Sequence, residues 1–134
     1  MDLKLEVVLL PVSDVDQSKA FYEQVGFNTD VDMQPNEGVR IVQMTPPGSA
    51  CSVIVGKGLT TATPGSVQGT TLVVTDIEEA RADLARRGVD VSDFFHFGPG
   101  GQEAGLDPQR QDYGSFVSFS DPDENTWLVQ ERRG

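Results

Sequence analysis

The chain has 134 residues, enough for one compact domain or two small fused modules with a buried core. Its 21 acidic and 10 basic residues give a formal charge of −11, which disfavours nucleic-acid partners because phosphate backbones need a clustered basic surface. No apolar run approaches the ~20 residues that a membrane-spanning helix needs. The single cysteine, Cys51, excludes an internal disulfide and suits a reducing compartment, so we expect a cytoplasmic protein.

The first half of the chain predicts a strand, a helix and further strands. Residues 5–10 are mostly apolar and predict a buried strand. Ser13 or Asp14 then caps a helix, which Gly26 ends because glycine tolerates the left-handed conformation. The pattern places the following strands near residues 39–44 and 51–55.

The second half predicts the same order of elements. Residues 71–74 form a strand, Thr75 or Asp76 caps a helix, and Gly88 ends it. Further strands are expected near residues 94–97, 115–120 and 127–130, the last two joined by a turn that contains Pro122.

An internal repeat relates the two halves. The spacing from Asp14 to Asp76 equals the spacing from Gly26 to Gly88, so the register holds from helix start to helix stop. A turn proline, Pro46, recurs as Pro122 at a longer spacing, which predicts a loop insertion in the second half. The repeat therefore predicts two β-α-β-β-β modules, residues 1–57 and 66–134, with a linker at 58–65 and the insertion near 97–113, a candidate lid.

Two motifs stand at matching ends of the chain: the opening segment 11–16 with Ala20-Phe21-Tyr22, and the closing turn 121–127. Together they resemble the vicinal oxygen chelate superfamily, which includes glyoxalase I, bleomycin-resistance proteins and extradiol dioxygenases. The resemblance implies an α+β fold in which the mixed sheets of two β-α-β-β-β modules curl into a cup, and it implies pairing into a homodimer. Glu124 departs from the glycine usual in this turn, and a left-handed glutamate costs about 1 kcal/mol.

The resemblance also implies a divalent metal held by the first and last strands of each module. The corresponding positions here are Val7, Ser52, Gly69 and Leu128. Three of these have no donor atom in the side chain, and a lone serine is a poor ligand. We therefore expect no cofactor and disfavour a divalent metal.

A shifted metal site remains an alternative. It would have to combine His96 with Gln130, which strand alternation puts on the same face as Leu128. Glu6 and Glu131 fall on the opposite face, and we expect them at solvated strand ends.

The cup implied by the resemblance would have a largely apolar lining with a few hydroxyls and one amide. The predicted ligand-binding residues are Leu5, Val7, Leu9, Ser52, Ile54, Thr71, His96, Tyr113, Phe116, Leu128 and Gln130. The aliphatic ones among them are equally compatible with an ordinary core. Trp127 alternates away from the cup and is expected in the core. His96, beside a glycine-rich loop, is a candidate acid or base, or a structural histidine.

Two classes of function fit this pattern. The first is a protein that binds a small, largely apolar organic molecule without the family's usual metal, as the resemblance to bleomycin-resistance proteins implies. The second is a glyoxalase- or dioxygenase-like enzyme, such as a lyase, isomerase or oxidoreductase, that uses the shifted metal site or His96 as an acid or base. The empty ligand positions favour the first class.

Overall fold

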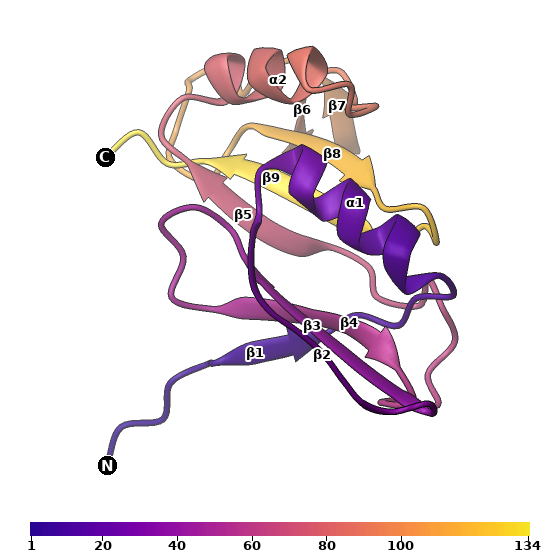
Figure 1. Ribbon diagram of the computed structural model, residues 1–134. Coiled ribbons are helices and arrows are strands. Elements are labelled where there is room, and N and C mark those ends of the chain that lie inside the picture. Colours follow the sequence, from indigo (N-terminus) through magenta and orange to yellow (C-terminus); the bar gives the residue numbers. More distant parts are fainter. The chain divides into compact units, whose positions relative to one another are not determined.

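A computed structural model describes all residues, 1–134. The chain divides into two compact units, residues 1–67 with 121–125 and residues 68–120 with 126–134. Each unit contains one helix and one mixed sheet (Figure 1). The predicted α+β class with two β-α-β-β-β modules is confirmed. Neither helix has the length and apolar character needed to cross a membrane.

The first unit has a four-stranded sheet in the order β1-β4-β3-β2, in which β1 runs parallel to β4 and the other pairs are antiparallel. Its elements are β1 (Val7–Leu9), α1 (Val15–Val25), β2 (Asn28–Asn36), β3 (Val39–Thr45) and β4 (Ser52–Lys57). Asp14 caps α1 as predicted, because its side chain accepts a hydrogen bond from the backbone N–H of Gln17. Gly26 ends the helix with a φ of 116°.

The core of the first unit lies between α1 and one face of the sheet. Val42 and Met44 of β3 alternate inward, as do Val53 and Val55 of β4, and all four are buried. Strand β2 was not predicted. Its sequence is largely polar and its residues are almost all exposed, so this edge strand has no apolar alternation to reveal it.

The turn Asp121–Asn125 belongs to the first unit, although the strands that flank it, β8 (Phe116–Ser120) and β9 (Thr126–Glu131), belong to the second. Asn125 is fully buried, and its Nδ2 donates to the carbonyl oxygen of Pro11 at 2.9 Å and to Oδ2 of Asp121 at 2.8 Å. The hydroxyl of Tyr22 donates to the same Asp121 oxygen at 2.8 Å. Glu124 has a φ of 70°, so this glutamate takes the left-handed conformation.

The second unit has a five-stranded sheet in the order β5-β9-β8-β6-β7, with β5 parallel to β9. Its elements are β5 (Thr70–Val74), α2 (Ile77–Arg86), β6 (Phe95–Gly98), β7 (Gly101–Ala104), β8 (Phe116–Ser120) and β9 (Thr126–Glu131). Asp76 caps α2 as predicted and accepts from the N–H groups of Glu78 and Glu79. The predicted insertion 97–113 is not all loop, because β7 folds back on β6 as a short hairpin.

The core of the second unit lies between α2 and the face of the sheet that carries Trp127 and Val129. Trp127 is 1% exposed and stacks on Phe119 with ring centroids 6.0 Å apart, so its predicted place in the core is confirmed. The helix contributes Ile77 and Leu84 to the same core.

Strand pairing corrects one expected correspondence between the modules. Val8 pairs with Val53 in the first unit, and its repeat counterpart Thr70 pairs with Trp127 in the second. Val53 therefore corresponds to Trp127. The residues that follow them also correspond, so the counterpart of Leu128 is Ile54 and not Ser52. The prediction aligned the prolines of the two turns, but the turns differ in length, since one covers residues 46–51 and the other 121–125.

Candidate ligand-binding faces

The first sheet has one face turned away from α1, and four of the predicted residues lie on it. In the parallel pair β1–β4, Val7 lies opposite Ser52 and Leu9 opposite Ile54, so their side chains share a face. Ser52 is buried, and its Oγ lies 2.6 Å from Oγ1 of Thr45. Val7 is 37% exposed, while Leu5 precedes β1 and is 71% exposed. The structure thus gathers an aliphatic face but leaves Leu5 outside the strand.

The residues at the metal-ligand positions do not fit a divalent cation. With the corrected register these positions are Val7, Ile54, Gly69 and Leu128, and none offers a side-chain oxygen, nitrogen or sulfur. Nowhere in the chain do three His, Cys, Asp or Glu side chains gather in a way that could hold a metal ion.

The second sheet has a matching open face, opposite α2. Thr71 lies opposite Leu128, and Gln130 lies between Val73 on one side and Phe116 on the other. Directly paired residues share a face, so Thr71, Phe116, Leu128 and Gln130 come together as predicted. Leu128 and Gln130 are half-buried.

Three phenylalanines form an aromatic cluster on this second face. The ring of Phe116 stacks on Phe95 at a centroid distance of 5.6 Å and meets Phe97 edge-on at 5.3 Å. Phe97 is 57% exposed, whereas Phe95 and Phe116 are buried. Of the three rings, only Phe116 was predicted to bind a ligand. Alternation puts Phe95 and Phe97 on one face of their strand and His96 on the other. Which of these faces carries Phe116 depends on the pairing of Phe95 with Phe116, which the sequence does not show.

His96 points to the other side of the sheet. It follows Phe95 in β6, and neighbouring residues of a strand face opposite ways. Its Nδ1 lies 2.8 Å from the carbonyl oxygen of Gly105, and its Nε2 lies 3.2 Å from Oε2 of Glu103. The structure therefore does not bring His96 together with Gln130, which the shifted metal site would require.

Tyr113 lies beside Gln130 at the end of β9. The backbone N–H of Tyr113 donates to the carbonyl oxygen of Glu131 at 2.6 Å, and its carbonyl oxygen accepts from Nε2 of Gln130 at 3.1 Å. The tyrosine ring is exposed, with the guanidinium of Arg132 5.9 Å from its centroid. The structure thus joins the predicted residues Tyr113, Gln130 and Phe116 at one edge of the second face.

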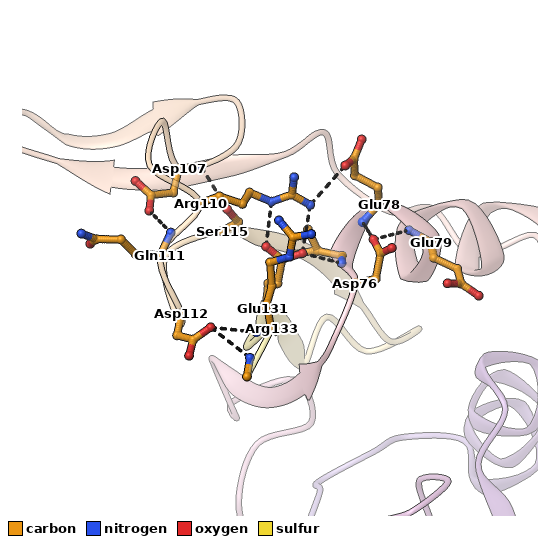
Figure 2. A network of polar contacts seen from close by, with 12 residues as sticks. Asp76, Glu78, Glu79, Asp107, Arg110, Gln111, Asp112, Ser115, Glu131 and Arg133 are labelled. Atoms are coloured by element: carbon orange, nitrogen blue, oxygen red, sulfur yellow. Dashed lines mark hydrogen bonds and ion pairs between the residues drawn. The ribbon is translucent and has the colours of Figure 1, made fainter.

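An ion pair between the half-buried Arg110 and the buried Glu131 ties the loop before Tyr113 to the sheet and to α2 (Figure 2). Arg110 contacts both carboxylate oxygens of Glu131, with Nε to Oε1 at 2.7 Å and Nη2 to Oε2 at 3.0 Å. The backbone N–H of Ile77, at the start of α2, donates to Oε2 of Glu131 at 3.0 Å. Arg110 also reaches Oε1 of Glu78 at 3.1 Å.

The expectation that Glu131 ends the strand in solvent was wrong, because its side chain is fully buried. Burial by itself raises the pKa of Glu131, but the hydrogen bonds from Arg110 and Ile77 outweigh it and lower the pKa below its ordinary value. Only the fold reveals this pair, since the two residues are 21 positions apart in the sequence.

The first unit contains a separate cavity of about 620 Å³ between the start of α1 and the segment 56–64. Its two cations already have partners. Arg40 binds Asp32 and Asp16 at 2.6–3.1 Å, and Lys57 donates to the carbonyl oxygen of Glu37. The hydrogen bonds from Arg40 and Lys19 lower the pKa of Asp32 to about 2. The cavity therefore offers no unengaged cation to an anionic ligand.

Comparisons with known proteins agree with this architecture. The family model described as Glyoxalase/Bleomycin resistance protein/Dioxygenase superfamily matches residues 4–129. No curated protein sequence matches the chain.

Solved structures cover nearly the whole chain. TnmS3, an antibiotic binding protein from Streptomyces sp. CB03234, is 32% identical with a TM-score of 0.75, over 98% of this chain and 97% of its own. A glyoxalase/bleomycin resistance protein from the same organism is 33% identical with a TM-score of 0.71, over 96% of this chain and 100% of its own.

A third similar structure comes from Sphaerobacter thermophilus DSM 20745 and is a member of the same superfamily. It is 28% identical with a TM-score of 0.73, over 98% of each chain. Together with the two β-α-β-β-β modules and the family match over residues 4–129, these likenesses show that the chain belongs to the glyoxalase/bleomycin resistance protein/dioxygenase superfamily.

Proposed function

We propose that this protein binds a small, largely apolar organic molecule on the open face of its second sheet, without a metal ion. The observation that carries the proposal is the cluster of Phe95, Phe97 and Phe116 beside the amide of Gln130. Phe97 is the exposed ring of this cluster, and it packs on the buried rings of Phe95 and Phe116. Apolar and aromatic side chains next to a polar group that can orient a ligand are the usual composition of a small-molecule site.

The energetics favour a flat or aromatic occupant. Covering the exposed ring of Phe97 removes apolar surface from water, at roughly 25 cal/mol per Å². Ring-on-ring contact adds about 0.5–1.5 kcal/mol beyond the buried area. The first face is aliphatic where the second is aromatic, so the second offers the stronger anchor.

The relatives support the same class of function. TnmS3, at 32% identity, is an antibiotic binding protein, which is a precedent for a small organic ligand in this fold. The donor-free positions Val7, Ile54, Gly69 and Leu128 support binding without a metal ion. The homodimer implied by the resemblance stays a prediction, to be checked by light scattering against the 14.5 kDa monomer.

The test uses the neutral planar probe 1-hydroxypyrene at a fixed low concentration, with protein titrated in and fluorescence anisotropy recorded. The protein is purified without chelators and its metal content is measured by elemental analysis. We expect saturable binding that is unchanged when EDTA is added. Binding that EDTA abolishes and zinc or nickel restores would overturn the metal-free proposal, and absence of saturable binding would overturn the site.

A further inference from the structure

Gln130 has a defined amide orientation. Its side chain contacts the carbonyl oxygen of Tyr113, which can only accept a hydrogen bond, so the contacting atom is the donor Nε2, at 3.1 Å. The amide oxygen Oε1 is then turned away from Tyr113. Because Gln130 pairs directly with Phe116, its side chain lies on the same face as the aromatic cluster, next to it in the sheet.

The carbonyl that orients Gln130 is itself held in place. Tyr113 and Arg110 have φ values of 66° and 51°, which cost about 1–2 kcal/mol each for residues other than glycine. Such conformations persist only where the surroundings fix them. Here Glu131 fixes both residues, because its carboxylate binds the side chain of Arg110 and its carbonyl oxygen accepts a hydrogen bond from the N–H of Tyr113.

The loop between these two contacts is also fixed by Asp107. Its Oδ2 accepts from the N–H of Gln111 at 2.7 Å and its carbonyl accepts from the N–H of Arg110 at 2.9 Å, and the first of these bonds is drawn in Figure 2. A chain of contacts therefore leads from the ion pair Arg110–Glu131 through Tyr113 to the amide of Gln130. That amide would be free to turn if the loop moved.

We propose that Gln130 determines specificity by accepting a hydrogen bond at Oε1 from a hydroxyl or amine on the edge of a planar aromatic ligand. Arg110 and Glu131 are the positioning residues that keep this acceptor oriented. The inference rests on the proposed function, since it concerns the same face, and it adds the ligand class: planar aromatic molecules that carry a hydrogen-bond donor.

The experiment compares two probes that differ only in the donor, 1-hydroxypyrene and 1-methoxypyrene. The wild-type protein should bind 1-hydroxypyrene about 5- to 10-fold more tightly, the effect of one hydrogen bond. Gln130→Leu should bind both probes with equal affinity. The control Gln17→Leu changes an exposed glutamine of α1 and should keep the wild-type preference.

The positioning role is tested with Arg110→Met and with Arg110→Lys, which keeps the charge but loses the paired contact. Both should reduce the preference for 1-hydroxypyrene to about 2-fold or less while affinity for 1-methoxypyrene stays near wild type. Arg110→Lys decides the matter if Arg110→Met does not fold. If Arg110 had a merely structural role, its replacement would weaken the binding of both probes equally and leave the preference for 1-hydroxypyrene intact.

The outcomes separate the two proposals. If both probes bind equally to the wild type and Gln130→Leu changes neither, the specificity inference is wrong while the binding function stands. If neither probe binds, the proposed function fails and the inference falls with it. If the preference survives in both Arg110 variants, Gln130 keeps its role and the positioning pair is refuted.

Discussion

The cross-strand pair Ile41–Gly56 of the first unit holds the place that Phe116–Gln130 holds in the second. The first pair consists of an aliphatic side chain beside a glycine, and the second consists of an aromatic ring beside an amide. One residue further along the last strand, the exposed Lys57 corresponds to the fully buried Glu131. The two sheets share their pairing but not the chemistry of their open faces.

The two repeated modules thus agree in the residues that form the fold and differ in the residues on their open faces. Both helices are capped by an aspartate, Asp14 or Asp76, and the core of each unit is lined by apolar residues of its sheet. In the second unit the open face carries the amide of Gln130, and the next residue, Glu131, faces the other side of the sheet. The ion pair of Glu131 with Arg110 holds the loop beside that amide, which is how binding sites are supported.

The largest expected effect comes from the closing turn that the second repeat contributes to the first unit. Asn125→Ala removes donors to Pro11 and Asp121 and the acceptor for the N–H of Val67. At about 1 kcal/mol for each buried bond, we expect a loss of about 3 kcal/mol in the free energy of unfolding, measured by urea denaturation.

The matched control for this change is Ser49→Ala in the corresponding turn of the first repeat. Ser49 is exposed and bonds only within its own turn, so we expect a change below about 0.5 kcal/mol. Equal losses from the two variants would contradict the central role assigned to Asn125.

A smaller effect, dependent on pH, is expected at Glu131. Glu131→Gln loses charge-assisted hydrogen bonds and should cost about 2 kcal/mol at pH 7. The pKa of Glu131 is lowered in the folded state, so its contribution is present above its ordinary value of 4.5 and is lost as the pH falls below it. Urea denaturation between pH 7 and pH 3 should show that the free energies of unfolding of the wild type and of Glu131→Gln converge as the pH falls.

Lys57→Gln is the control at the corresponding position of the first unit. Its side chain is exposed, so stability should change by less than about 0.5 kcal/mol with no convergence in acid. If the free energies of unfolding of wild type and Glu131→Gln differ by the same amount down to pH 3, the carboxylate charge is not what stabilises the fold.

The smallest effect concerns the two turns themselves. Glu124 and Gly48 are both left-handed residues in the turn before the last strand of their module, with φ of 70° and 77°. Glu124→Gly should therefore stabilise the protein by about 1 kcal/mol and Gly48→Glu destabilise it by a similar amount. Thermal unfolding of both variants checks this, and a loss of stability in Glu124→Gly would show that its side chain makes a compensating contact.

The sequence predicted the features that depend on local chemistry. The residue type of Asp14 and Asp76 indicates the starts of the two helices. The family resemblance selected Val7 and Leu128, and alternation along the strands then selected the residues that share their faces. The sequence could not predict Phe97 as a site residue, because that follows from the pairing of Phe95 with Phe116 across the chain. Nor could it predict that Arg110, in an apparent loop, would bury Glu131.

The most direct test of the account compares Phe97→Ala with Val7→Ala, one exposed apolar residue from each open face. The measurement is the affinity for 1-hydroxypyrene by fluorescence anisotropy, with thermal unfolding as a check on folding. Loss of one ring contact should weaken binding about 10-fold in Phe97→Ala, while Val7→Ala stays within about 2-fold of wild type. Wild-type affinity in Phe97→Ala together with a 10-fold loss in Val7→Ala would contradict the assignment of the binding site to the second face.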